Sequence, residues 1–312
     1  MAKKNIQFIF NPTELGAGTR GASLGPEAIR TAARSKGSSI FSDYRVATVE
    51  HQNHLLDRGT NFKFAKYIDG LGLVFNELSK TIEECFKSKC FPIILSGDHS
   101  AAAGTFGALK NLYPKNRIGV VWIDAHADLH SPFTTPSGNL HGMPVAAGLG
   151  LDHHHLAENN PDTETIAYWN QLKSGIIQPQ DLIYVGVRDT ETQEDALINE
   201  LQLRNYTIKE LRQRGLALCL QEISNSLAAC DYIYISFDVD SIDPIESSMG
   251  TGTPVSNGLL FREANDILCF FAKNEKLCAL EIVEINPCLD DKQNTMAEQA
   301  LQLIENVLDN RT

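Results

Sequence analysis

The sequence lacks long apolar runs. In its 312 residues, apolar side chains never continue unbroken for the roughly 18 positions that a membrane-spanning helix needs. Residues 1–10 begin with basic side chains but have neither an adequate apolar stretch nor the cleavage site of a secretory leader. We therefore expect a cytoplasmic protein that does not insert into a membrane.

Positive charge is also scarce, since 27 Lys and Arg residues face 39 Asp and Glu residues and leave a formal net charge of -12. An acidic surface repels phosphate backbones, which argues against nucleic-acid binding. Chemistry on a small molecule or a metal fits this balance of charge better.

Paired cysteines are absent, because none of the seven cysteines forms a C-x-x-C pair. An odd number, mostly within apolar or helical stretches, predicts reduced and largely buried thiols. The cysteines are Cys85, Cys90, Cys219, Cys230, Cys269, Cys278 and Cys288.

Short apolar runs alternate with longer amphipathic stretches along the whole chain. The expected strands are 6–10, 44–49, 91–95, 118–123, 182–187, 232–237 and 277–283. The expected helices are 26–34, 64–87, 101–112, 208–228, 261–273 and 295–308. Buried strands joined by crossover helices predict an α/β fold with three layers, α/β/α, around a mainly parallel sheet. No shift in composition marks a boundary, so we expect a single domain over residues 1–312.

Residues 148–165 resemble an inserted surface loop and contain three adjacent histidines, His153 to His155. Neighbouring side chains on a loop seldom converge on one ion. We therefore interpret this run as a solvated turn rather than a metal site.

Polar side chains concentrate directly after the predicted strands, where ligands bind in parallel sheets. His99 follows one strand, and Asp238 and Asp240 follow another. The segment 124–128 follows a third and has the pattern D-x-H-x-D, in which alternate residues of an extended chain point to one side. We therefore expect six metal ligands: His99, Asp124, His126, Asp128, Asp238 and Asp240.

The charge of these ligands indicates the number and kind of ions. Four clustered carboxylates repel one another, and two divalent cations balance their charge of about -4, whereas one would not. Carboxylate and imidazole ligands without thiolate favour Mn²⁺. A pair of such ions lowers the pKa of a water between them toward about 7, which produces hydroxide at neutral pH.

These residues belong to motifs that resemble the ureohydrolase family, which includes arginases, agmatinases and formimidoylglutamases, and the arginases most of all. The resemblance covers nearly the whole chain. The matching segments are 16–30, 96–100, 124–128, 137–142, 236–240, 250–254 and 283–287.

The resemblance implies a three-layer α/β/α fold, assembly into homotrimers or hexamers, and two Mn²⁺ ions per chain. One ion would take His99 and Asp128 as terminal ligands, and the other His126 and Asp240. Asp124 and Asp238 would bridge the two ions.

The resemblance also implies the substrate, because the segment 137–142 is similar to the arginase loop that contacts an amino acid. The implied activity is hydrolysis of L-arginine to L-ornithine and urea by a metal-bridging hydroxide. The catalytic residues would be His141, Asp128 and Glu284. The substrate-binding residues would be Ser137, Asn139, His130, Thr135, Glu191, Glu194 and Glu284.

Three residues depart from the arginase pattern. Ser96 replaces a common glycine, His130 replaces an asparagine near the substrate carboxylate, and Glu191 replaces an aspartate that senses the α-amino group. Because of the last two departures, agmatine or a guanidino acid other than arginine remains possible as the substrate.

The chemistry of guanidine hydrolysis assigns roles to these residues. A guanidinium is a planar cation and a poor electrophile, so Glu284 would fix its plane while the hydroxide attacks. Asp128 would receive the proton of the hydroxide, and His141 would carry a proton to the departing amine.

Two other classes of protein remain as alternatives. A metal-dependent deacetylase has a related fold with a single zinc, but one zinc needs about three protein ligands and six are expected here. A non-catalytic homologue would not need the catalytic His141 and Glu284. One metal ion per chain would favour the deacetylase, and failure of manganese-loaded protein to hydrolyse any guanidine would favour the non-catalytic homologue.

Overall fold

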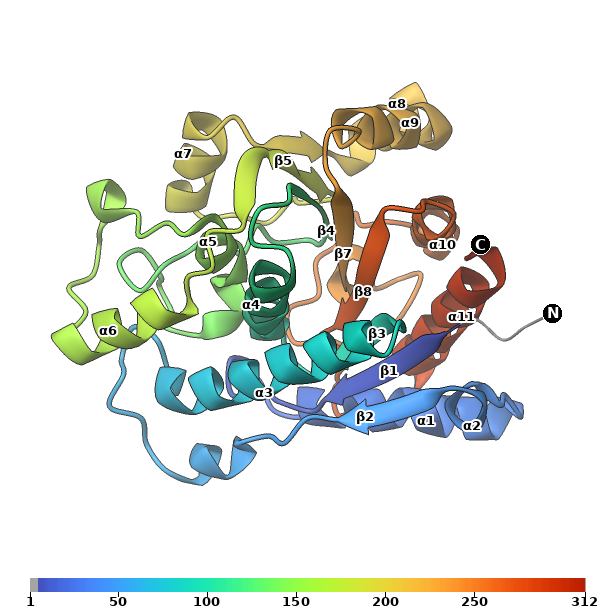
Figure 1. Cartoon of the computed structure of the whole chain (residues 1–312), viewed down its shortest axis with the longest axis horizontal. Coiled ribbons are helices and arrows are strands. Elements are labelled where there is room, and N and C mark those ends of the chain that lie inside the picture. Colours follow the sequence, from blue (N-terminus) through green and yellow to red (C-terminus); the bar gives the residue numbers. More distant parts are fainter. Residues whose placement is uncertain (1–4, 312) are drawn as a thin grey trace.

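A computed structural model describes residues 5–311, so most of the basic start of the chain, residues 1–4, lies outside the described part together with residue 312. One eight-stranded sheet runs through the molecule in the order β2-β1-β3-β8-β7-β4-β5-β6, and every neighbouring pair is parallel (Figure 1). The strands are β1 Ile6–Asn11, β2 Arg45–Thr48, β3 Phe91–Ser96, β4 Ile118–Ile123, β5 Ile177–Val185, β6 Arg204–Tyr206, β7 Tyr232–Asp238 and β8 Leu277–Val283.

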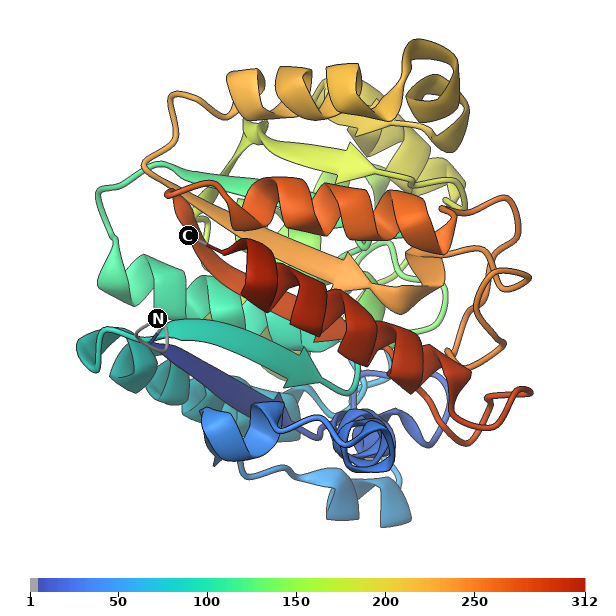
Figure 2. The ribbon, with the colours of Figure 1, turned by 90° about the vertical axis from the view of Figure 1, so that its right-hand side faces the viewer.

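Helices cover both faces of the sheet, which confirms the predicted three-layer α/β/α fold (Figure 2). One face packs against α1 Gly25–Lys36, α2 Ile40–Asp43, α8 Ile208–Arg214, α9 Leu216–Ser226, α10 Phe261–Ala272 and α11 Thr295–Asn310. The other packs against α3 Ile68–Lys87, α4 Ala102–Leu112, α5 Pro144–Leu149, α6 Thr163–Leu172 and α7 Thr192–Glu200.

Three strands near the centre of the sheet are buried along their whole length because helices cover both of their faces. Every residue of β3, β4 and β8 is buried. This explains why these strands are nearly continuous apolar runs in the sequence rather than alternating ones, with the buried Glu281 as the one charged residue in them.

Glycine and short elements account for the differences from the predicted pattern. The expected helix 208–228 is two helices, α8 and α9. Gly215 between them has φ 91° and ψ 127°, and these angles are incompatible with a helix. The expected strand 182–187 is β5, which begins earlier and ends at Val185, before Gly186 with φ 89°. Sequence reasoning missed β6, α2, α5, α6 and α7, because these elements are short or weakly periodic.

The prediction of a solvated turn at the three histidines is wrong for one of them. His153 is buried at 5% exposure, whereas His154 and His155 are exposed. Burial lowers the pKa of His153 to about 4, so this imidazole is neutral at pH 7. The three rings do not converge, since His154 packs on Phe133 and His155 contacts Glu200.

Two other predictions concern the thiols and the membrane. All seven cysteines are free and five of them are buried, as predicted. Within residues 5–311, no helix is both long and apolar enough to cross a bilayer.

Candidate metal centre and adjoining cavity

The predicted ligands and Glu284 meet at the carboxyl ends of four adjacent strands. His99 lies in a short 3-10 turn after β3, Asp124 follows β4, and Asp238 ends β7. Asp240 lies in the 3-10 turn that follows, and Glu284 comes directly after β8. Because β3, β8, β7 and β4 are neighbours in that order, residues far apart in the sequence reach one point.

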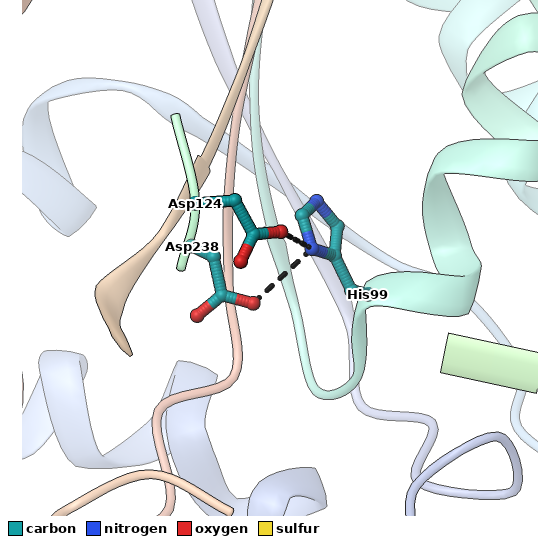
Figure 3. A group of neighbouring side chains, drawn as sticks. All are labelled: His99, Asp124 and Asp238. Carbon is teal, nitrogen blue, oxygen red and sulfur yellow. Dashed lines mark ion pairs between the residues drawn. The ribbon is translucent and has the colours of Figure 1, made fainter. Parts of the chain in front are cut away.

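Three carboxylates surround a single nitrogen of His99. Its Nδ1 atom lies 3.0 Å from Asp124 Oδ2, 3.1 Å from Asp128 Oδ2 and 3.1 Å from Asp238 Oδ2. Figure 3 shows the Asp124 and Asp238 contacts. One N–H cannot satisfy three acceptors, and this buried nitrogen makes no hydrogen bond of good geometry. A cation among these atoms would satisfy all of them, so this donor set fits a metal.

A second group of ligands overlaps the first. His126 Nδ1 lies 3.1 Å from Asp240 Oδ2 and 3.5 Å from Asp124 Oδ1. The two oxygens of Asp124 therefore face different histidines, and the structure contains two possible ion sites that share this carboxylate. Asp238 contacts the His99 group, while its other oxygen accepts a hydrogen bond from Asp240 N at 2.9 Å.

The side chains of 124–128 converge as predicted, but the extended backbone that was expected to bring them together is wrong. The segment is not extended, since Asp128 has φ 50° in the left-handed region. The carboxylate of Asp124 also accepts a hydrogen bond from His126 N at 2.7 Å, which folds the chain into a tight turn. That turn brings Asp128 back beside Asp124.

Burial controls the electrostatics of these carboxylates. It raises the pKa of Asp128 to about 6, with the charge of Asp124 as the next cause. It also raises the pKa of Asp238 and of Asp240. Burial alone would raise the pKa of Asp124, but hydrogen bonds from His126 and His99 outweigh it and lower that pKa. The centre therefore has excess negative charge that cations would relieve.

Glu284 and His141 lie next to the ligands. Glu284 Oε1 accepts a hydrogen bond from His99 N at 2.9 Å and lies 3.3 Å from His141 Nδ1. Burial would lower the pKa of His141, but its contact with Glu284 raises that pKa to about 9. This pair places a proton-carrying imidazole beside the group expected to bind a guanidinium.

A cavity of about 320 Å³ extends outward from these residues. It brings together every predicted site residue except Asp124, which is fully buried beneath it. The predicted residues that line it are His99, His126, Asp128, His130, Thr135, Ser137, Asn139, His141, Glu191, Glu194, Asp238, Asp240 and Glu284.

The two unusual residues of the substrate region contact each other. His130 Nε2 lies 3.0 Å from Glu191 Oε2, and this hydrogen bond is the main cause that lowers the pKa of Glu191 to about 2. Glu194 has a structural role, because it accepts hydrogen bonds from Leu129 N and Glu191 N at the start of α7.

Sequence reasoning missed several residues that support the site. Ser236 Oγ lies 2.7 Å from His99 Nε2, Trp122 stacks on the His99 ring at 4.1 Å, and Trp122 Nε1 donates to Asp124 Oδ2. Both residues lie two positions before a ligand aspartate. Because alternate residues of a strand point to the same face, the sequence could have indicated that they lie beside the ligands. Lys66 Nζ donates to Asn139 Oδ1 at 3.1 Å, and no sequence signal indicated it.

The fold and the site together define a class of protein: a parallel α/β/α sheet with candidate metal sites at the carboxyl ends of its strands. Comparison with known proteins narrows this class, because the model of the arginase family matches residues 4–309. The chain belongs to the arginase family.

Individual relatives cover almost the whole chain. The arginase of Bacillus subtilis (strain 168) is 32% identical over 308 residues and covers 98% of both chains. The arginase of Brevibacillus brevis is 33% identical over 309 residues and covers 97% of both. The crystal structure of Entamoeba histolytica arginase in complex with L-ornithine has a TM-score of 0.84 at 27% identity, covering 98% of this chain and 99% of that one. The family resemblance predicted from the motifs is confirmed, and the chain is a hydrolase of guanidino compounds.

Proposed function

We propose that this protein is an arginase that hydrolyses L-arginine to L-ornithine and urea with two Mn²⁺ ions per chain. One observation carries the proposal: two ligand groups share Asp124 at the base of a cavity that also contains Glu284 and His141. A guanidinium held by Glu284 would therefore lie directly against the metal ligands.

The donor atoms support two ions rather than one. His99, Asp128 and Asp238 would hold the first ion, His126 and Asp240 the second, and Asp124 would serve both. The family resemblance implies that Asp238 would also serve both ions. Carboxylates and imidazoles without a thiolate suit Mn²⁺. When bound, the ions supply an activated water as the nucleophile.

Glu284 would orient the substrate. A carboxylate can accept parallel N–H bonds from a guanidinium, which fixes the plane of that group and exposes its central carbon. Glu284 is only 2% exposed, so little water competes for this ion pair.

His141 and Asp128 would move the protons. The pKa of His141 is about 9 beside Glu284, so its imidazole is protonated at pH 7 and can donate to the departing amine. Asp128 lines the cavity beside His99, where it would accept the proton released from the attacking water.

The outer part of the cavity would bind the amino-acid end of arginine. We propose that Ser137, Asn139, Thr135 and His130 contact its carboxylate side, and that Glu191 and Glu194 face its amino group; all six line the cavity. The contact between His130 and Glu191 favours a second candidate, hydrolysis of another guanidino acid or of agmatine, because it already uses the Glu191 carboxylate.

A urea assay tests both candidates. Metal-stripped protein is reloaded with Mn²⁺ and incubated with L-arginine, agmatine and a guanidino acid that lacks the α-amino group. We expect the highest kcat/KM with arginine. A higher value with either of the other two would transfer the proposal to that substrate, and absence of urea from all three would refute guanidine hydrolysis at this site.

Three further properties belong to this proposal. We propose that residues 1–312 form one domain, which the single sheet through residues 5–311 supports. We also propose that the protein is cytoplasmic and assembles as a homotrimer or hexamer, as the family resemblance implies. Light scattering on the metal-loaded protein tests the assembly.

A further inference from the structure

The segment 152–159, which includes the three histidines, packs behind the loop 131–135 at the outer end of the cavity. The loop contains Thr135, which lines the cavity, and it follows His130 directly. Phe133, Thr134 and Thr135 are all buried, so the loop is enclosed on the side away from the cavity. We call residues 152–159 the brace.

One end of the brace is fixed to α6. The carboxylate of Asp152 accepts hydrogen bonds from Trp169 Nε1 at 2.9 Å and from Lys173 Nζ at 2.6 Å. Its backbone oxygen accepts a hydrogen bond from Ser131 Oγ at 2.6 Å. The start of the loop is therefore tied to a helix through Asp152.

The other end of the brace holds the rest of the loop through backbone carbonyls. The oxygen of Phe133 accepts hydrogen bonds from Glu158 N and Asn159 N, both at 2.9 Å. The side-chain amide of Asn159 donates to Thr135 O at 2.7 Å and to Pro132 O at 3.2 Å. One side chain thus fixes carbonyls at both ends of the turn.

The position of this turn determines where the binding side chains lie. Thr135 Oγ1 accepts a hydrogen bond from Gly138 N at 2.9 Å, so the turn is coupled to the segment that contains Ser137 and Asn139. A displacement of Thr135 would move these side chains relative to Glu284. Asn159 does not line the cavity and can act only through the loop.

We propose that Asn159 is a positioning residue that holds the loop 131–135 in the geometry needed to bind the amino-acid end of the substrate. The part of the inference that concerns substrate affinity rests on the proposed function. Loss of the Asn159 amide would weaken binding of that end while the metal centre and Glu284 stay in place.

Kinetics of two variants and a matched control test the inference. Asn159→Ala removes both donors, and Asn159→Asp keeps the size of the side chain but points carboxylate oxygens at two carbonyls. We expect the KM for arginine to rise about fivefold to twentyfold, more for Asp than for Ala, with kcat within about twofold. The control Asn160→Ala changes the exposed neighbouring asparagine and should leave both constants unchanged. An unchanged KM in both Asn159 variants, or a fall in kcat alone, would overturn the inference.

Hydrogen exchange gives a readout that does not need activity. The amides of Thr134 and Thr135 donate to Ser131 O at 3.0 Å and report on the turn. In the metal-loaded protein we expect them to exchange about tenfold faster in Asn159→Ala than in Asn160→Ala, while amides of β4 stay protected. Equal exchange would refute the positioning role. If the wild-type protein released no urea from any guanidino compound, the proposed function would fail, and this measurement would still decide the role of Asn159.

Discussion

At the scale of the residue, the centre depends on side chains that each serve more than one partner. Asp124 faces both histidines, and Glu284 contacts both a ligand backbone and His141. Substitution of such a residue therefore disturbs several contacts at once. Measuring both the metal content and kcat of each variant separates an effect on metal binding from an effect on catalysis.

His141→Ala tests the proton-carrying role. Among the described residues, the ion pair of the His141 imidazole is with Glu284 and not with a ligand carboxylate. We therefore expect the variant to keep its metal. Loss of a general acid typically lowers the rate by 100-fold or more, and we expect kcat to fall by about that factor. Urea release and metal analysis measure the two effects. His51→Ala, which changes an exposed histidine, is the control, and an unchanged kcat would remove His141 from the mechanism.

Asp124→Asn tests the shared carboxylate. Because Asp124 faces both groups, we expect this variant to lose both ions, whereas Asp128→Asn affects the His99 group and should retain about one ion per chain. Metal content after gel filtration in Mn²⁺-free buffer is the measurement. Asp195→Asn, at an exposed position, should retain both. Retention of two ions by Asp124→Asn would contradict the proposal that both ion sites share the Asp124 carboxylate.

At the scale of the element, buried polar contacts fix strands and a helix relative to one another near the site. Glu281 on β8 is fully buried and accepts hydrogen bonds from Ser96 Oγ, Thr105 Oγ1 and Tyr234 OH, each at 2.7 Å. These donors come from β3, α4 and β7. Ser96 therefore supplies one of the donors that the buried carboxylate requires.

The break between α8 and α9 gives a prediction at the same scale. Gly215 has φ 91° and ψ 127°, so Gly215→Ala strains the backbone although the added Cβ would meet open space, and we expect a loss of about 1–3 kcal/mol of stability. Gly72 lies inside α3, also with open space around a Cβ, so Gly72→Ala should add about 0.5–1 kcal/mol. Denaturant unfolding compares the two variants, and shifts of the same sign would refute the argument.

At the scale of the whole molecule, an acidic protein concentrates buried carboxylates and histidines at one edge of its sheet. In the protein without metal, the carboxylates raise the pKa of His99 and of His126, although burial opposes them. These shifts favour the protonated form of both imidazoles, which places positive charge within the centre.

The affinity for Mn²⁺ should consequently depend on pH. A metal ligand must be a neutral imidazole, so binding releases the protons of His99 and His126, and affinity rises as pH rises. We expect up to about tenfold tighter binding per pH unit for each proton released. Titration calorimetry at pH 6.5, 7.5 and 8.5, in buffers of different ionisation enthalpy, measures both the affinity and the protons. Equal affinity at all three values would contradict this prediction.

Much of the architecture follows from the sequence because a buried parallel sheet needs strands that are mostly apolar, and such runs are visible directly in β3, β4 and β8. Polar residues directly after these runs must then lie at one edge, so the convergence of the six proposed ligands and Glu284 could be predicted. His141 lies in a short 3-10 turn that does not directly follow a strand, and only the resemblance to the arginases indicated it. Short elements such as β6 and α7 could not, because their few residues have weak periodicity and tertiary contacts stabilise them.

The sequence by itself determined the order of the layers and the set of chemical groups at the centre, since both depend on local patterns of apolar and polar residues. Only the tertiary structure decided how those groups meet. The left-handed turn at Asp128, the contact between His130 and Glu191 and the hold of Asn159 on Thr135 join residues through backbone geometry and through contacts across the fold. No local pattern encodes such contacts, because each depends on where a distant segment packs.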